Sequence, residues 1–185
     1  YLRIGRDTLT AGSIPTADAL TWSRAGAPVV YHSWGAAVFF WLIYQAGGLP
    51  LTVLLRGLLL ALTYGAVFAA ARRLGAEPRG AGLATFLAVL ASSNNWSLRP
   101  QLLAYPLFAL ALFLLIRWQE GSAKAAWGLP LIGLLWVNLH GSFVMLFLLG
   151  GAALLFGRGD RRRLGAAMFI GLLATLANPR GLGAW

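Results

Sequence analysis

The stretch AAWGLPLIGLLWVNLHGSFVMLFLLGGAALLFG, residues 125–157, decides the class of this protein, because its 33 residues contain no charged side chain. As one helix it would be about 50 Å long, well beyond the roughly 30 Å hydrocarbon core of a bilayer. Its only polar cluster is Asn138-Leu139-His140-Gly141-Ser142, where a glycine lets the chain reverse or unwind. We therefore expect two short membrane spans that meet at this cluster.

Further apolar stretches lie on both sides of this one. Residues 51–71 are interrupted only by Arg56, and residues 81–97 and 100–116 have 17 residues each without a charge. Residues 164–177 form another short apolar stretch before Asn178-Pro179. A helix needs roughly 17 to 25 mainly apolar residues to cross a bilayer. The sequence therefore predicts an all-α, polytopic integral membrane protein with about six transmembrane helices.

The composition excludes an ordinary water-soluble globule. Of the 185 residues, 59% are apolar and only 11% are charged, against about 25% charged in a typical soluble domain. The net charge is +10, but the basic residues occur in short clusters between uncharged runs, a pattern that indicates membrane topology and not a nucleic-acid partner. With no cysteine among these residues, disulfides, thiolate nucleophiles and cysteine metal sites are excluded as well.

The basic clusters predict which end of each span faces the cytoplasm. Nine basic residues fall on one side, and the positive-inside rule assigns that side to the cytoplasm. The connections on the opposite side, residues 92–101, 138–142 and 178–181, are polar but nearly uncharged. The basic residues are Arg72, Arg73, Arg79, Arg117, Lys124, Arg158, Arg161, Arg162 and Arg163.

The N-terminal part is placed by the length of one segment. Residues 33–46 would give a helix of only about 21 Å, too short to span comfortably, so we interpret them as an amphipathic or re-entrant helix on the outer surface. Residues 1–50 then form an outer loop with a short surface helix, and residues 51–185 form the transmembrane bundle. If residues 33–46 crossed the membrane, residues 1–32 would lie inside instead. Because the chain begins at Tyr1 and stops at Trp185, we expect it to be a piece of a longer protein.

The outer segments supply the candidate functional residues, since no nucleotide-binding, hydrolase or metal-binding motif is present. Guanidinium groups at Arg99 and Arg180 suit an anionic substrate such as a lipid phosphate. The Asp18 carboxylate could act as a general base or hold a divalent cation. The full candidate set is Asp18, His32, Arg99, Gln101, Asn138, His140, Asn178 and Arg180.

Several candidates have a purely structural alternative. Asp18 could cap a helix beginning at Ala19, and Asn138 and Asn178 could be caps or turn formers. Arg99-Pro100 could anchor a helix end at the interface. His140 could close the helix break with a hydrogen bond.

A set of motifs in a fixed order resembles a group of bacterial polytopic proteins similar to the GT-C glycosyltransferases. The motifs cover nearly the whole chain, although none is diagnostic alone. They are Gly12-Ser13-Ile14-Pro15-Thr16-Ala17-Asp18-Ala19-Leu20-Thr21-Trp22, Gly26-Ala27-Pro28 with His32-Ser33-Trp34, Arg99-Pro100-Gln101, Trp136-Val137-Asn138-Leu139-His140-Gly141-Ser142-Phe143 and Asn178-Pro179-Arg180-Gly181.

The resemblance implies an inverting membrane transferase in the bacterial cytoplasmic (inner) membrane. It would move a sugar from a polyprenyl-phosphate donor to an acceptor on the non-cytoplasmic side, with the lipid-linked sugar and membrane lipids as its partners. Asp18 matches the aspartate of the first outer loop and would be the base or a metal ligand. Arg99 and Arg180 would stabilise the departing phosphate, and Asn138 and His140 would orient sugar or phosphate oxygens.

A second hypothesis is a non-catalytic structural subunit of a larger membrane complex. The abundant glycine and alanine residues could form helix-packing faces, and Ser33 stands where the resembled pattern favours a glutamate. In one version of this hypothesis His32 or His140 ligates a pigment or a haem, since imidazole is a common metal ligand.

Overall fold

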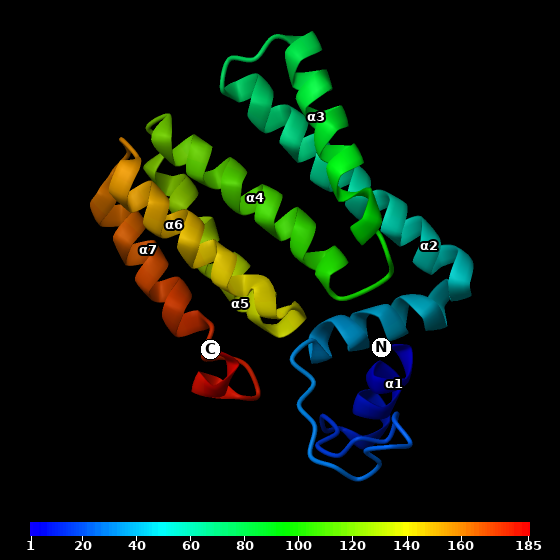
Figure 1. The fold of residues 1–185 in the computed structure, drawn as a ribbon. Coiled ribbons are helices and arrows are strands. Elements are labelled where there is room, and N and C mark those ends of the chain that lie inside the picture. The colour runs from blue at the N-terminus through cyan, green and yellow to red at the C-terminus, as the bar shows by residue number, and fades with distance from the viewer.

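The computed structural model describes residues 1–185 and is entirely helical apart from its loops (Figure 1). One isolated bridge pairs Ala17 with Pro28, and no strand forms. The all-α prediction is therefore confirmed. The α-helices are α1 (Leu2–Ala11), α2 (Trp34–Arg73), α3 (Pro78–Ser92), α4 (Gln101–Gln119), α5 (Leu129–Leu139), α6 (Val144–Phe156) and α7 (Arg161–Ala174), and the 3₁₀ helices are η1 (Ser93–Asn95), η2 (Ala123–Gly128), η3 (Gly141–Phe143) and η4 (Gly181–Ala184).

Helix α2 is two helices joined at a sharp kink. Gly47 (φ −156°, ψ 18°) and Gly48 (φ 63°, ψ −155°) leave the helical region, and Pro50 follows them without an N–H to donate. Figure 1 shows the first half of α2 lying across the end of the bundle and the second half rising beside α3. The prediction that residues 33–46 form a helix separate from residues 51–71 is confirmed, while their position on a lipid surface stays a prediction.

The long apolar run at residues 125–157 breaks where its polar cluster predicts. Helix α5 ends at Leu139, His140 has an extended backbone (φ −162°, ψ 141°), and α6 begins at Val144 after the turn η3. Figure 1 shows α5 and α6 meeting at the end of the bundle beside the chain termini. The break therefore brings His140 to the same end as the N-terminal segment.

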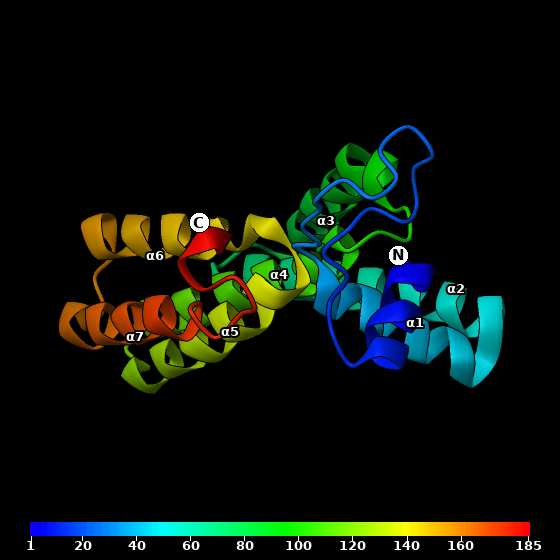
Figure 2. The same cartoon turned by 90° about the horizontal axis from the view of Figure 1, so that it is seen from below.

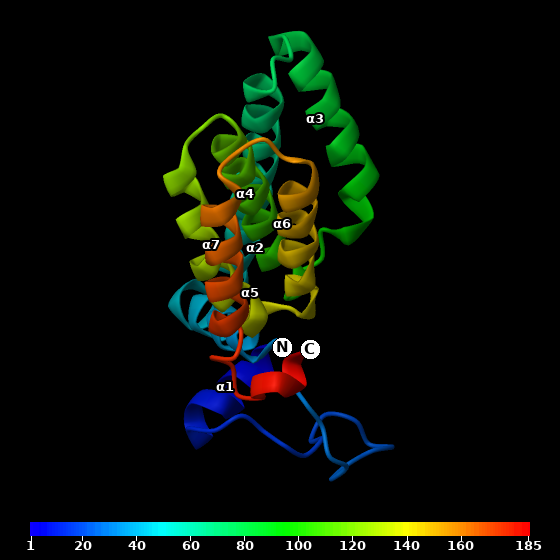
Figure 3. The same ribbon diagram turned by 90° about the vertical axis from the view of Figure 1, so that its left-hand side faces the viewer.

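Helices α4 to α7 form the main core. Trp118, Trp136 and Phe143 are its largest fully buried side chains, packed with leucine and alanine residues of the same helices. A β-carbon at Gly133 would lie 3.3 Å from the carbonyl oxygen of Gly171, so small residues let α5 and α7 approach closely. Figure 3 shows these helices side by side, with α3 projecting at the edge.

The N-terminal segment packs on the bundle through a second, smaller apolar cluster. Helix α1 lies directly on α2, since a β-carbon at Gly5 would overlap the Ala37 carbonyl oxygen. Ala36 and Phe40 of α2 pack with Leu103 of α4. Figure 2 shows α1 against the first half of α2, away from α6 and α7. The cluster fixes α1 and the start of α2 near the start of α4.

Two helices, and not the expected six, are long and apolar enough to cross a membrane by length and composition, namely α2 and α4. The other apolar helices are shorter because the chain breaks them with glycine, proline and polar turns. At 1.5 Å per residue the 11 residues of α5 extend only about 17 Å. The structure therefore shows two helices of spanning length, and the larger number of about six membrane helices stays a prediction.

The charged residues separate between the two ends of the bundle. All nine basic residues assigned to the cytoplasmic side lie in or next to the α2–α3, α4–α5 and α6–α7 connections, together with Glu77, Glu120 and Asp160. These connections lie at the end we call the basic end (Figure 1). The N-terminal segment, the α3–α4 and α5–α6 connections and the C-terminus lie at the opposite end, which we call the polar end (Figure 1).

Ion pairs and a hydrogen bond tie the connections of the basic end together. Arg73 Nη2 lies 3.1 Å from Glu120 Oε2, which joins the end of α2 to the end of α4. Trp118 Nε1 donates to the Asp160 carbonyl oxygen over 3.0 Å, and Asp160 also caps α7 through the Arg163 N–H. The arginine-rich corners are therefore partly structural.

Candidate functional site

A cavity at the polar end gathers several of the predicted site residues. Its volume is about 180 Å³. Four segments line this cavity: the N-terminal loop, the start of α2, the α5–α6 break and the C-terminal turn. The lining includes Pro15, Tyr31, His32, Trp34, Gly141, Asn178 and Arg180, and contains no carboxylate. We call it the polar-end pocket.

The cation of the polar-end pocket is paired with a histidine. Arg180 Nη1 lies 2.9 Å from His32 Nδ1 and 3.1 Å from His32 Nε2. A neutral imidazole has one acceptor nitrogen, so one of these contacts is a hydrogen bond that the guanidinium donates. Both residues are exposed, which leaves the remaining guanidinium N–H groups free to bind an anion entering the pocket.

Asn178 shapes the turn that presents Arg180. Its Oδ1 accepts a hydrogen bond from the Arg180 N–H over 2.8 Å, and its Nδ2 donates to the carbonyl oxygens of Thr175 and Gly181. Gly181 has a φ of +52°, which favours glycine. The structure therefore gives Asn178 the turn-forming role, with its two N–H groups used inside the chain.

Asn138 joins α2 and α5 to the turn after α7 beside the pocket. Its Oδ1 accepts from the Trp34 indole N–H over 3.0 Å, and its Nδ2 donates to the Leu134 and Ala177 carbonyl oxygens over 2.9 and 3.1 Å. A β-carbon at Gly35 would lie 2.8 Å from the Asn138 carbonyl oxygen, so only glycine permits this contact between α2 and α5. The Asn138 amide thus holds the start of α2 and the turn after α7 against α5.

His140 belongs to a chain of hydrogen bonds beside the pocket. The Ser142 N–H donates to His140 Nδ1 over 3.1 Å, and the Ser142 hydroxyl lies 2.7 Å from the same nitrogen. The Trp136 indole N–H donates to that hydroxyl over 3.2 Å. Because Nδ1 accepts, the neutral ring carries its proton on Nε2. Burial lowers the pKa of His140 below 6.5, so the ring is neutral at physiological pH and offers an N–H donor.

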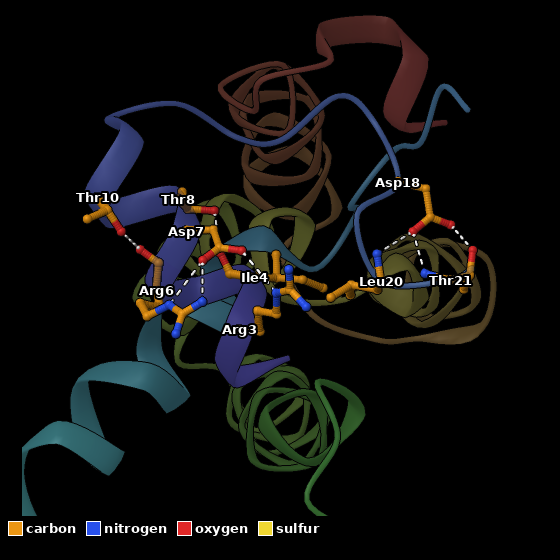
Figure 4. Close-up of polar contacts among 9 residues, drawn as sticks. All are labelled: Arg3, Ile4, Arg6, Asp7, Thr8, Thr10, Asp18, Leu20 and Thr21. Carbon is orange, nitrogen blue, oxygen red and sulfur yellow. Dashed lines mark hydrogen bonds and ion pairs between the residues drawn. The ribbon is translucent and has the colours of Figure 1, made fainter. Parts of the chain in front are cut away.

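Asp18 lies in a tight turn and is absent from the pocket lining (Figure 4). It accepts hydrogen bonds from the Thr21 hydroxyl and from the Leu20 and Thr21 N–H groups, the latter two over 2.8 and 3.0 Å. These bonds lower the pKa of the Asp18 carboxyl below 3.8. No helix begins at Ala19, because residues 19–33 form turns and extended segments. Asp18 therefore caps a turn and not the expected helix, and its role as a base stays a prediction.

The other outer carboxylate, Asp7, pairs with basic residues of its own helix. Asp7 lies 3.0 Å from the Arg6 guanidinium and 3.6 Å from that of Arg3 (Figure 4). No group of three His, Asp or Glu side chains lies close enough together to hold a metal ion. The residues present therefore do not form a divalent-cation site around Asp18.

Arg99 and Gln101 lie at the polar end but outside the pocket lining. Arg99 precedes Pro100 in the turn before α4, and Gln101 is the first residue of that helix. Arg99 is exposed and forms no ion pair. Of the eight predicted residues, the pocket lining therefore contains His32, Asn178 and Arg180, while Asn138 and His140 flank it.

Sequence reasoning missed three residues of this site. Trp34 lines the pocket, and its indole N–H donates to Asn138. Tyr31 lines the same pocket, where burial and then the nearby Asp18 carboxylate raise the pKa of its hydroxyl above 10. Ser142 relays the Trp136 bond to His140. The only available signal was that each stands within two residues of a predicted one.

The arrangement combines an arginine, a fixed turn and aromatic walls. A guanidinium matches the geometry of phosphate oxygens, and Tyr31 and Trp34 offer apolar faces of the kind that line small-molecule sites. The pocket is thus suited to an anionic group that carries a ring. A comparison of this chain with protein-family models, with curated proteins and with solved structures finds no match.

Proposed function

We propose that this chain is the membrane-embedded part of a protein that resembles the GT-C glycosyltransferases. In this proposal the polar-end pocket lies on the non-cytoplasmic side of a bacterial inner membrane. It binds the sugar and phosphate of a lipid-linked donor, and the sugar passes to an acceptor.

The outward faces of the helices support the membrane placement. Large apolar side chains point away from the core along most helices, including Leu62 at 64% exposed and Phe156 at 83%. Soluble monomers rarely expose contiguous apolar surface of this extent. Hydrocarbon tails would cover these side chains, and the short helices α3, α5, α6 and α7 would join α2 and α4 in a polytopic bundle of about six membrane segments.

The separation of charge supports the orientation. The basic end carries nine basic and three acidic side chains, whereas the polar end carries five basic side chains (Arg3, Arg6, Arg24, Arg99 and Arg180) and two acidic ones (Asp7 and Asp18). The positive-inside rule places the basic end in the cytoplasm. The polar-end pocket then opens to the periplasmic side, where lipid-linked sugar donors of this class react.

The observation that carries the function is the Arg180–His32 pair in a pocket built from both ends of the chain. In an inverting transfer, a base removes the proton of the acceptor hydroxyl while the lipid phosphate leaves the anomeric carbon. Arg180 would stabilise the charge that builds on the departing phosphate, and the His140 Nε2–H would donate to a sugar or phosphate oxygen. Asp18 stays the predicted base, although its carboxylate does not line the pocket in this structure.

The test is transfer by protein reconstituted in nanodiscs, with a polyprenyl phosphate carrying a radiolabelled hexose as the donor. Arg180→Ala should lower donor binding and transfer by about 10- to 100-fold, because a charge-assisted hydrogen bond is lost. Arg24→Ala, at an exposed arginine of the N-terminal loop outside the pocket lining, is the matched control. Equal activity of the two variants would contradict the assignment of Arg180.

The non-catalytic subunit is the second candidate, and one observation favours it. No carboxylate lines the pocket, and Asp18 is held by three hydrogen bonds. Under this candidate the unmodified protein transfers no sugar, so Asp18→Asn and Arg180→Ala cannot lower the activity. The pocket would still bind a lipid phosphate. Visible absorbance of the purified protein decides the pigment or haem version.

A further inference from the structure

Arg56 is a charged residue without a partner inside an apolar helix. It is the only charged side chain among residues 49–71. It is half-buried, and none of the ion pairs of the chain includes it. It lies six residues after Pro50, so it sits about 9 Å along the second half of α2 from the polar end. A cation in this position is costly unless an anion or water satisfies it.

A groove adjoins Arg56 and has a volume of about 740 Å³. One wall is the second half of α2, with the apolar side chains of Val53, Leu54, Leu58 and Leu60 around Arg56 and Gly57. The other wall is the turn after α3, with Ser93, Asn94, Trp96 and Ser97. Figure 1 shows α3 descending beside this half of α2. We call this cavity the Arg56 groove.

Aromatic and hydroxyl contacts hold the two walls together. The Trp96 indole N–H donates to the Tyr64 hydroxyl over 3.0 Å, and the same hydroxyl bonds the Ser92 hydroxyl. The rings of Tyr64 and Trp96 lie 6.1 Å apart. The groove is therefore a built feature between α2 and the end of α3, and not a gap left by a loose loop.

The two kinds of groups in the groove match the two parts of an anionic phospholipid. The guanidinium and the polar side chains of the turn would bind phosphate oxygens. Leu54 and Leu58 are 58% and 53% exposed, and they would contact hydrocarbon chains. We propose that the Arg56 groove binds an anionic phospholipid of the leaflet at the polar end, with its phosphate on Arg56. This proposal rests on the membrane placement proposed above and is independent of sugar transfer in the polar-end pocket.

The charge balance favours a lipid over a protein partner at this position. The polar end has two acidic residues, Asp7 and Asp18, and both are already bonded within α1 and the turn after it. No acidic side chain of the chain reaches Arg56. A phosphate at the lipid interface is the anion that lies at the depth of Arg56 in the proposed bilayer.

The experiment is a binding titration of the purified chain in neutral detergent with short-chain phosphatidylglycerol, short-chain phosphatidylcholine and inorganic phosphate. We expect phosphatidylglycerol to bind about 10-fold or more tightly than phosphatidylcholine, and Arg56→Gln to remove that preference. Arg24→Gln, at an exposed position of the same end, should keep it. Gly57→Leu retains Arg56 but fills the groove and should also weaken binding, because no atom lies within 4 Å of its added β-carbon.

Three outcomes overturn the proposal. Arg56→Gln could bind phosphatidylglycerol as the unmodified chain does, inorganic phosphate at millimolar concentration could displace the lipid completely, or Gly57→Leu could bind unchanged. A liposome flotation assay separates this failure from that of the membrane placement. Protein that floats with liposomes but shows no Arg56-dependent lipid preference contradicts the groove alone, whereas protein that stays at the bottom contradicts the membrane placement itself.

Discussion

Individual polar residues at the polar end differ in whether their hydrogen-bonding groups are already used. The side chains of Asn138, Asn178 and Asp18 form hydrogen bonds with neighbouring backbone groups and side chains. Arg180 and His140 keep N–H groups that no other residue accepts. N–H groups that the protein does not use can donate to a ligand, so Arg180 and His140 are the better source of substrate contacts.

The Asp18 turn should depend on pH in acid. The pKa of the Asp18 carboxyl in the folded chain lies below 3.8, its ordinary value in the unfolded chain. Between these two pKa values the unfolded chain binds more protons than the folded chain. The hydrogen bonds of Asp18 therefore stabilise the folded turn above about pH 3.8, and this stabilisation is lost as the pH falls through the folded pKa. We expect the amide proton shifts of Leu20 and Thr21 to titrate together with a midpoint below 3.8, as measured by NMR in micelles. Thr21→Val should move the midpoint upward. A midpoint at or above 3.8 in the unmodified chain would contradict the observed hydrogen bonds.

Replacing Asn138 should destabilise the fold. Asn138→Leu keeps the approximate volume but leaves the Trp34 indole N–H and the Ala177 carbonyl oxygen without their partner. The free energy of unfolding should fall by about 2 kcal/mol, as measured by chemical denaturation in mild detergent. Asn94→Leu is the matched control, since Asn94 is exposed, and it should change the stability by less than about 0.5 kcal/mol. Similar losses in the two variants would show that the Asn138 bonds do not join the helices.

At the scale of elements, the kink in α2 decides what the polar end contains. A straight helix from Trp34 to Arg73 would carry its N-terminal half away from the bundle end. The Gly47-Gly48 kink instead lays that half across the end of α4 and α5 (Figure 1). Trp34 then reaches Asn138, and His32 reaches Arg180. The pocket therefore depends on a conformation that Gly48 adopts.

The kink predicts opposite effects for two glycine substitutions in α2. Gly48→Ala should lower the free energy of unfolding by about 1–3 kcal/mol, because φ +63° with ψ −155° is accessible essentially to glycine alone. Gly65→Ala should raise it by up to about 1 kcal/mol, because Gly65 is helical with open space at its β-carbon. Denaturation of both variants under the same conditions measures the difference. A stabilising Gly48→Ala substitution would mean that α2 does not kink as described.

For the whole molecule, the two ends of the bundle have different chemistry. One end carries the clustered arginines and the Arg73–Glu120 ion pair between α2 and α4, and the other carries the pocket and the paired histidine. Both chain termini lie at the polar end, although apart from each other (Figure 1). The proposed orientation requires that all the polar connections share one side of the membrane.

Single-cysteine labelling can test this orientation, because the chain contains no native cysteine. Ser13→Cys and Ser93→Cys should react with a membrane-impermeant maleimide added to intact spheroplasts. Ser122→Cys, in the α4–α5 connection at the basic end, should react only after permeabilisation. Labelling of Ser13→Cys and Ser93→Cys from opposite sides would contradict the common face of the N-terminal segment and the α3–α4 connection.

The sequence by itself determined the helical class, the separation of residues 33–46 from residues 51–71, the break at residues 138–142 and the division into a basic and a polar end. These features follow from local causes: apolar runs, glycine and proline that interrupt them, and charges that cluster between them. The number of helices long enough to cross a membrane was harder to predict from the sequence, because a run of apolar residues does not reveal where turns shorten its helix. The helix expected at Ala19 was wrong for a related reason, since Asp18 caps a turn equally well.

Only the tertiary structure decided which polar residues meet. His32 and Arg180 are 148 residues apart, and Trp34 and Asn138 are 104 apart. Sequence patterns assigned these residues to the same end of the bundle, but many different pairs of residues at that end could be in contact. Their contacts depend on the direction in which the kinked α2 crosses the bundle and on how closely Gly35 lets it approach α5. Those are properties of packed helices, and no local pattern contains them.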